Sequence, residues 1–244
     1  MCPAPSRAGS SSNRRPRSAL SRSARRFAAY RSRASVATYP GKFIVLDGPE
    51  GAGKTTQVER LVHRLRRDGR QATAVRDPGS TPVSERIRDI LLDKRLPDMD
   101  ARTEVFLYMA SRAEMVARII RPALEVGLVV VCDRFVSSTV AYQGAAGGVD
   151  TALIWELGRI ACAGLEPDLT VILDLDVEAG LARRERERPR DRIESKQRAY
   201  HEKVRRGFLA MARERPQEFA VVDASRPLDE VARDIEEAVA RVLR

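Results

Sequence analysis

From Lys42 onward, short apolar runs alternate with longer amphipathic segments. The apolar runs are FIVLD, ATAV, LVVVCD, LTVILDLD and FAVVD, and this pattern predicts strands that are buried on both faces. The amphipathic segments predict helices over 54–68, 82–93, 101–126, 149–163, 177–187, 191–214 and 227–243. Because strands that alternate with helices require crossover connections, we expect an α/β fold with a five-stranded parallel sheet and helices on both faces. Ligands bind such sheets beyond the carboxyl ends of the strands.

Most of the net charge lies before the first predicted strand. Residues 1–40 contain nine Arg and no acidic side chain, so they account for nine of the ten net positive charges. This stretch has too few large apolar side chains to offset the entropy of ordering, which predicts a disordered tail before a single domain over 41–244. Three interpretations of the tail stay open: an organellar transit peptide, a basic arm for nucleic acid, or a stretch upstream of a true start at Val36.

The cysteines and histidines do not indicate a metal site. Cys2, Cys132 and Cys162 have no paired spacing, so neither a disulfide framework nor a zinc site is predicted, and Cys132 lies in an apolar run typical of a buried position. His63 and His201 fall in helical patterns rich in Arg and Glu, which favour the surface. No apolar run approaches the roughly 18 residues that would span a membrane, so no membrane partner is expected.

The first predicted strand is followed by GPEGAGKT, which fits the phosphate-binding pattern G-x-x-x-x-G-K-[ST]. In such a loop, backbone N–H groups surround the phosphates of a nucleotide, Lys54 reaches the terminal phosphates, and the hydroxyl of Thr55 faces Mg²⁺. The loop predicts the three-layer fold of P-loop NTPases. The residues expected to bind ATP are Gly48, Pro49, Glu50, Gly51, Ala52, Gly53, Lys54, Thr55 and Thr56.

Several classes of P-loop protein are excluded by the sequence. A GTPase reads guanine with an N-K-x-D segment, but Asn13 is the only Asn in the chain and precedes the loop. No Leu-Ser-Gly-Gly signature of a transporter is present either. A small-molecule kinase is therefore favoured.

A second cluster of polar residues, DRFVSSTVAYQG, follows the third predicted strand. Asp133 ends that strand and is expected to hold a water on Mg²⁺, while Arg134 presents a planar cation that suits a phosphate. The alternative for these two residues is an ion pair that caps the strand. The side chains expected to read a base and a sugar are Ser138, Thr139, Tyr142 and Gln143.

Four motifs, GPEGAGKT, RDPGST, FLYMASR and DRFVSSTVAYQG, occur in this order, and together they resemble those of thymidylate kinase. The resemblance runs from Phe43 to the C-terminus, and the DR-x-x-x-ST-x-AYQG element is its most specific part. It implies transfer of the γ-phosphoryl group of ATP to dTMP with Mg²⁺, in a cytoplasmic homodimer whose folded domain binds no nucleic acid. Thr55 and Asp133 are the implied metal ligands.

The same resemblance assigns roles around the phosphate and the sugar of dTMP. Arg76 and Arg134 are similar to the pair that clamps the monophosphate. Glu50 is similar to the acidic residue that binds the 3′-hydroxyl, and Tyr142 would crowd the 2′ position and so favour the deoxy sugar.

Around the base, Tyr108 stands where the family usually has Phe stacked on thymine. Arg112 lies four residues later on the same helix face and would bind a base carbonyl, and Pro78 would pack near the thymine methyl group. The other residues implied to contact the base are Ser138, Thr139 and Gln143.

The segment GLARRERERPRDRIE carries six Arg and is interrupted by Pro189, which predicts a mobile Arg-rich loop. The plain alternative is a solvated helix face. In the family this segment is a lid over ATP, here about 181–193, and Gly51 in place of a loop arginine resembles the bacterial pattern, in which the lid supplies the catalytic cation. The residues expected to act in catalysis are Lys54, Arg134, Arg183, Arg188 and Arg192, of which Arg183 would lie against adenine.

Two other functions stay open. One is a nucleoside monophosphate kinase with a broader pyrimidine pocket. The other is a catalytically idle nucleotide-binding protein that its basic tail directs to nucleic acid, for which salt-sensitive DNA binding would be diagnostic.

Overall fold

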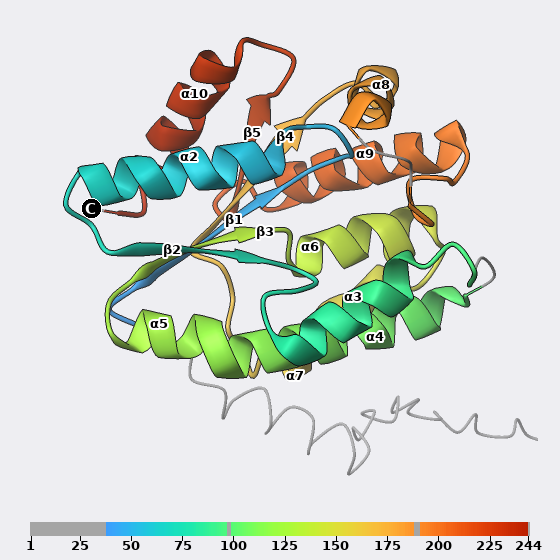
Figure 1. The fold of residues 1–244 in the computed structure, drawn as a ribbon, viewed down its shortest axis with the longest axis horizontal. Helices are drawn as coiled ribbons and strands as arrows, with labels where there is room; N and C mark the ends of the chain where they lie inside the picture. The colour runs from blue at the N-terminus through green and yellow to red at the C-terminus, as the bar shows by residue number, and fades with distance from the viewer. Residues whose placement is uncertain (1–37, 97–98, 188–190, 244) are drawn as a thin grey trace, which may run out of the picture. The chain divides into compact units, whose positions relative to one another are not determined.

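The computed structural model describes residues 38–96, 99–187 and 191–243. Within these residues, five strands form one sheet: β1 (Lys42–Asp47), β2 (Ala72–Arg76), β3 (Val129–Asp133), β4 (Leu169–Asp174) and β5 (Phe219–Asp223). Every neighbouring pair of strands is parallel, and the order is β2-β3-β1-β4-β5. The predicted α/β fold with a five-stranded parallel sheet is confirmed, and β1 lies at its centre (Figure 1).

Helical segments connect these strands along the described part of the chain. The α-helices are α2 (Lys54–Arg67), α3 (Pro82–Leu92), α4 (Ala101–Met115), α5 (Arg121–Glu125), α6 (Val136–Thr139), α7 (Thr151–Ala161), α8 (Val177–Glu187), α9 (Arg198–Glu214) and α10 (Leu228–Ala240). Two π-helical segments, η1 (Val116–Ile120) and η2 (Val140–Ala146), continue α4 and α6.

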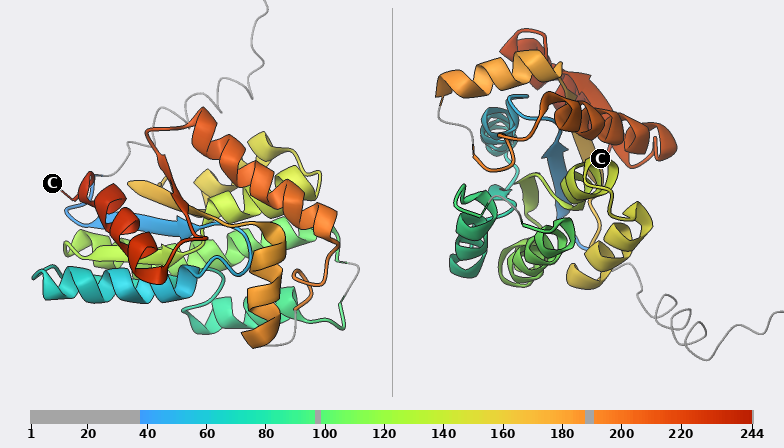
Figure 2. Two further views of the ribbon diagram at one scale, coloured as in Figure 1. Left: turned by 90° about the horizontal axis from the view of Figure 1, so that it is seen from above. Right: turned by 90° about the vertical axis from the view of Figure 1, so that its right-hand side faces the viewer.

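Side chains that alternate along the strands pack against two different helix layers. Phe43 and Val45 belong to a core shared with α4, α7 and α9, whereas Ile44 and Leu46 belong to a core shared with α2 and α10. Figure 1 and Figure 2 show the sheet between these layers. Because successive strand side chains point to opposite faces, a strand between two helix layers must be apolar throughout, which explains runs such as FIVLD.

Several helix boundaries differ from the prediction. The helix expected over 101–126 is divided into α4, η1 and α5, and Pro122 lies in the first turn of α5, where its missing N–H weakens the regular α-helical ladder. The helix expected from 191 begins at Arg198, since Asp191 Oδ1 caps a separate turn by accepting the N–H groups of Ile193 and Glu194. The helix expected from 149 begins after the N-cap Asp150.

The segment 136–146 is helical, which the sequence pattern did not predict. Ser, Thr, Val and Gly are weak helix formers, so local propensity argues against a helix there. The first nine of these residues are all buried, and the helix packs closely on α9: a Cβ added at Gly207 would lie 2.8 Å from Ala145 Cβ. Tertiary packing therefore decides this element.

Two single-residue expectations have opposite outcomes. The burial expected for Cys132 is confirmed, but the surface position expected for His201 is wrong, because His201 shares the buried face of α9 with Val204 and Phe208. No helix in the described ranges is long and apolar enough to cross a membrane. The predicted tail and Pro189 lie outside the described residues.

Candidate active site

The phosphate loop joins β1 to α2 and depends on glycine at three positions. Gly48, Gly51 and Gly53 have φ angles of 134°, 69° and 81°, a region that favours glycine, and Gly53 directly precedes α2. A Cβ at Gly51 would also lie 2.0 Å from the carbonyl oxygen of Gly180. The tip of the loop therefore rests on the backbone of α8, with no room for a side chain between them.

Lys54 begins α2 and is almost completely buried. Its Nζ donates hydrogen bonds to the carbonyl oxygens of Pro49 at 2.6 Å and Gly48 at 3.2 Å. Burial and the neighbouring Arg134 lower the pKa of Lys54 to about 8, although Glu50 acts in the opposite direction. The side chain is thus cationic at neutral pH and lies against the phosphate loop.

Thr55 and Asp133 meet beside the loop, where Thr55 Oγ1 donates to Asp133 Oδ2 at 2.6 Å. The contact forms because β1 and β3 are neighbours, with Leu46 opposite Asp133, so the carboxyl ends of both strands lie together. Within the described ranges, no group of three or more His, Cys, Asp or Glu side chains is arranged to hold a metal ion. A hydroxyl and a carboxylate are nevertheless ligand types that Mg²⁺ prefers, so these two residues fit the predicted metal.

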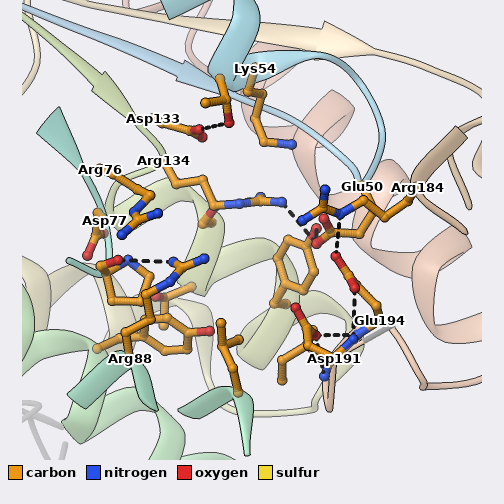
Figure 3. Close-up of a pocket in the computed structure, with 18 of the residues that line it drawn as sticks. Glu50, Lys54, Arg76, Asp77, Arg88, Asp133, Arg134, Arg184, Asp191 and Glu194 are labelled. Atoms are coloured by element: carbon orange, nitrogen blue, oxygen red, sulfur yellow. Dashed lines mark hydrogen bonds and ion pairs between the residues drawn. The ribbon is translucent and has the colours of Figure 1, made fainter. Parts of the chain in front are cut away.

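Arg134, Glu50 and Tyr142 form a second polar group on the cavity wall, part of which is seen in Figure 3. Arg134 donates to Glu50 Oε1 at 2.9 Å and to Ser138 Oγ at 3.1 Å, and its guanidinium lies 5.2 Å from the centre of the Tyr142 ring. The Tyr142 hydroxyl donates to the same Glu50 oxygen at 2.8 Å. Burial would raise the pKa of Glu50, but the cations Arg134 and Lys54 outweigh it and lower that pKa to about 2.

Asp47, the last residue of β1, fixes this wall from behind. It is fully buried and accepts hydrogen bonds from Ser137 Oγ and Ser138 Oγ, both at 2.6 Å, and from the backbone N–H of Gly48 at 2.9 Å. The sequence analysis did not include Asp47 in the site. Its position at a strand end, directly before the loop glycine, was the signal that could have identified it.

On the acceptor side, Arg112 is buried and makes three hydrogen bonds to oxygen atoms. It donates to Asp77 Oδ2 at 2.5 Å, to Thr139 Oγ1 at 2.7 Å and to the carbonyl oxygen of Phe135 at 2.8 Å, and it lies 5.5 Å from the centre of the Tyr108 ring. Burial raises the pKa of Asp77 even though Arg112 opposes the shift. The predicted base-reading pair, Tyr108 and Arg112, therefore shares one wall.

Two further arginines, Arg76 and Arg88, face the same cavity (Figure 3). Arg76 pairs with Glu85 at 3.0 Å, and Arg88 donates to the carbonyl oxygen of Pro78 at 3.0 Å. Burial and the nearby Arg76 lower the pKa of Arg88. Arg88 was missed by the sequence analysis, but it lies one turn after the buried Ser84 on α3, so helical periodicity could have identified its face.

Among the lid arginines of the described residues, Arg184 lines the cavity. Arg184 Nε donates to Glu194 Oε1 at 2.8 Å, and the backbone N–H of Asp191 donates to Glu194 Oε2 at 2.8 Å, so Glu194 joins the two ends of the lid (Figure 3). Arg183 turns away and donates to the carbonyl oxygen of Ala224 at 3.3 Å. The sequence analysis did not select Arg184.

Arg192, another predicted lid residue, does not line the cavity. Arg192 is buried and paired with Glu104, with 2.6 Å between its NH1 nitrogen and Glu104 Oε1. Arg188 lies outside the described residues.

The phosphate loop, the acceptor wall and the lid enclose one cavity of about 470 Å³. The predicted site residues that line it are Glu50, Gly51, Gly53, Lys54, Thr55, Thr56, Arg76, Pro78, Tyr108, Arg112, Asp133, Arg134, Ser138, Thr139, Tyr142 and Gln143. Gly48, Pro49 and Ala52 belong to the loop without lining the cavity.

The thymidylate kinase family model matches residues 46–235. The chain is 47% identical over 199 residues to thymidylate kinase of Deinococcus radiodurans, an alignment that covers 82% of this chain and 96% of the relative. It is also 47% identical over 203 residues to thymidylate kinase of Pseudomonas fluorescens, covering 83% and 97% of the two chains. This chain belongs to the thymidylate kinase family. The resemblance inferred from its four motifs is confirmed.

A solved structure supports the same assignment. The crystal structure of thymidylate kinase from Ehrlichia chaffeensis matches with a TM-score of 0.66 at 28% identity, covering 82% of this chain and 98% of that chain. The thymidylate kinase fold thus accounts for both the P-loop sheet and the helices that carry the acceptor wall.

Proposed function

We propose that this member of the thymidylate kinase family transfers the γ-phosphoryl group of ATP to the phosphate of dTMP, giving ADP and dTDP. The observation that carries the proposal is the common cavity, because the phosphate loop and an arginine-rich wall face each other across it. A loop for a nucleoside triphosphate opposite cations for a second phosphate is the arrangement that phosphoryl transfer requires.

On the donor side, the loop Gly48–Thr55 surrounds the phosphates of ATP with backbone N–H groups, and Lys54 neutralises charge on the terminal phosphates. Thr55 and Asp133 would hold Mg²⁺, and the bound ion would offset negative charge on the phosphates of ATP. The hydrogen bond of 2.6 Å between these two side chains supports a shared ligand site.

On the acceptor side, Arg76 and Arg134 bind the phosphate of dTMP, and Arg88 adds a third cation. Glu50 accepts the 3′-hydroxyl, and its low pKa of about 2 supports this role because the carboxylate stays ionised at neutral pH. Tyr142 lies against Glu50 through its hydroxyl, so its ring is well placed to exclude a 2′-hydroxyl.

The base of dTMP lies against the wall of Tyr108 and Arg112. The guanidinium of Arg112 is held by Asp77 and Thr139, so it can bind a base carbonyl without first being ordered. The remaining residues that we assign to the base are Pro78, Ser138, Thr139 and Gln143.

In the reaction, an oxygen of the dTMP phosphate forms a bond to the γ-phosphorus while the bond from that phosphorus to the β,γ-bridging oxygen breaks. The second pKa of a phosphate monoester is about 6, so the nucleophile is already an anion and no general base is required. Rate acceleration then comes from alignment and charge neutralisation by Lys54, Arg134 and the lid. Arg184 joins Arg183 and Arg188 as a candidate for the lid cation, because it lines the cavity.

A homodimer in the cytoplasm completes the proposal and rests on the family resemblance. Sedimentation of the purified chain would test the dimer, and a monomer across the working concentration range would contradict it.

The test of function is an ADP-release assay with the full chain, Mg-ATP and a panel of nucleoside monophosphates. We expect strong preference for dTMP. Comparable turnover of UMP or CMP would instead support a broader pyrimidine kinase with a pocket reshaped by Tyr108. No turnover on any acceptor would overturn the kinase assignment and favour the nucleotide-binding alternative.

A further inference from the structure

Arg192 lies at the end of the lid but faces the interior of the protein. Its side chain is 4% exposed, and it donates to the carbonyl oxygen of Leu91 at 2.8 Å and to Glu104 Oε1 at 2.6 Å. Its NH2 nitrogen lies 4.0 Å from the sulfur of Met99. All three contacts are with other residues of the folded chain. Arg192 does not line the cavity, whereas Arg184 does.

Glu104 connects Arg192 to the acceptor side. It is 1% exposed on α4, and its two oxygens have different partners. Oε1 binds Arg192 and lies 3.7 Å from Lys196 Nζ, whereas Oε2 accepts a hydrogen bond of 2.7 Å from Gln143 Nε2. One buried carboxylate therefore bridges the end of the lid and η2.

Gln143 lines the cavity, so its orientation matters for the acceptor. A carboxylate only accepts hydrogen bonds, which means that Glu104 selects the amide nitrogen and fixes Oε1 as the opposite end. Gln143 Oε1 is buried and has no hydrogen-bond partner within the described residues. An unpaired buried acceptor is unfavourable, so a hydrogen-bond donor of the substrate that reached Gln143 Oε1 would supply the hydrogen bond that this atom lacks and so stabilise the complex.

We propose that Arg192 and Glu104 are positioning residues for the acceptor pocket, which hold Gln143 in the orientation that dTMP requires. Arg192 supplies the opposite charge that pairs with Glu104 and holds its side chain in place inside the protein. The inference rests on the proposed function, since it assigns these residues to the binding of dTMP and not to the transferring phosphoryl group.

The test separates KM for dTMP from kcat in steady-state assays of Arg192→Met and Glu104→Gln. Both variants are expected to raise KM for dTMP about tenfold, while kcat and KM for ATP change by less than about threefold. Arg192→Lys keeps the charge beside Glu104 and should recover part of the loss. Two exposed positions provide matched controls, Arg213→Met and Glu125→Gln, and these should match the wild type.

If Arg192→Met lowers kcat and leaves KM for dTMP unchanged, the proposal is overturned, and Arg192 would instead act on the transferring phosphoryl group. If a single variant fails to fold by circular dichroism, the double variant Glu104→Gln/Arg192→Met removes both buried charges. A wild-type KM for dTMP in that double variant would also overturn the proposal. A wild-type chain with no turnover of dTMP would instead refute the proposed function, so the two failures are distinguishable.

Discussion

At the scale of single residues, the backbone conformation of Arg134 sets the position of a cation in the cavity. Arg134 adopts a positive φ of 71°, and this conformation at the end of β3 directs its guanidinium toward Glu50 and Ser138. Few residues other than glycine adopt this conformation, so the surrounding contacts must stabilise it. Asp47 supplies part of that support through Ser138.

Lys54 gives the clearest prediction at this scale. Lys54→Ala is expected to lower kcat by about a hundredfold or more, because a cation at the terminal phosphates is lost. In the wild type, kcat/KM for ATP should fall as pH rises through about 8, since the pKa of Lys54 is lowered to about 8 and the ammonium form is lost above it.

The measurement is a pH–rate profile of the wild type and of Lys54→Arg. Arginine stays protonated across this range, so the variant should lack the fall near pH 8 even if its overall rate is lower. A fall near pH 8 that persists in Lys54→Arg would assign this titration to another group.

At the scale of elements, the phosphate loop and α8 are in direct backbone contact. A Cβ at Gly180 would lie 2.2 Å from the carbonyl oxygen of Glu50, and a Cβ at Gly51 would meet Gly180 in the same way. Arg205 of α9 pairs at 2.7 Å with Asp174, the last residue of β4, and so ties α9 to the strand that leads into α8. The lid helix is therefore seated on the loop that binds ATP.

Gly180→Ala tests this contact. Helix propensity alone would make alanine about 1 kcal/mol more stable, but the clash with backbone cannot be relieved by a side-chain rotation, so we expect a net loss of about 1–3 kcal/mol in the free energy of unfolding. A lower kcat should accompany it. Urea unfolding provides the measurement, and Ala182→Ser, at an exposed position of the same helix, is the control. A stabilised Gly180→Ala variant would refute the close contact.

At the scale of the whole molecule, strand order creates the site. β1 is central, with β3 on one side and β4 on the other. The connection after β1 leads to β2 and the connection after β3 leads to β4, so the two leave the carboxyl edge of the sheet in opposite directions and open a crevice there. Helices of the described residues also line this crevice, and α2 begins at Lys54, within the phosphate loop.

Removal of residues 1–35 is predicted to leave kcat and both KM values within about twofold of the full chain. The reason is that β1 begins at Lys42 and every residue assigned to the site lies after it. Steady-state assays of the two chains make the comparison. A large loss of activity in the shorter chain would show that the tail belongs to the enzyme.

Local sequence patterns were sufficient to predict the five strands and the phosphate loop. These features depend on the identity and spacing of neighbouring residues: apolar runs require burial on both faces, and a Gly-rich turn before Lys-Thr requires a loop that fits phosphates. The helix over 136–146 was missed because its residues have weak helix propensity and it is stabilised by packing on other elements.

The sequence by itself therefore determined the fold class, the family resemblance and most of the residues around the cavity. Only the tertiary structure decided how the lid arginines divide, with Arg184 lining the cavity and Arg192 buried on Glu104. These arginines lie in one charged run, so local pattern cannot distinguish them. Their partners Glu194 and Glu104 come from different parts of the chain, and only folding brings Glu104 and Arg192 together.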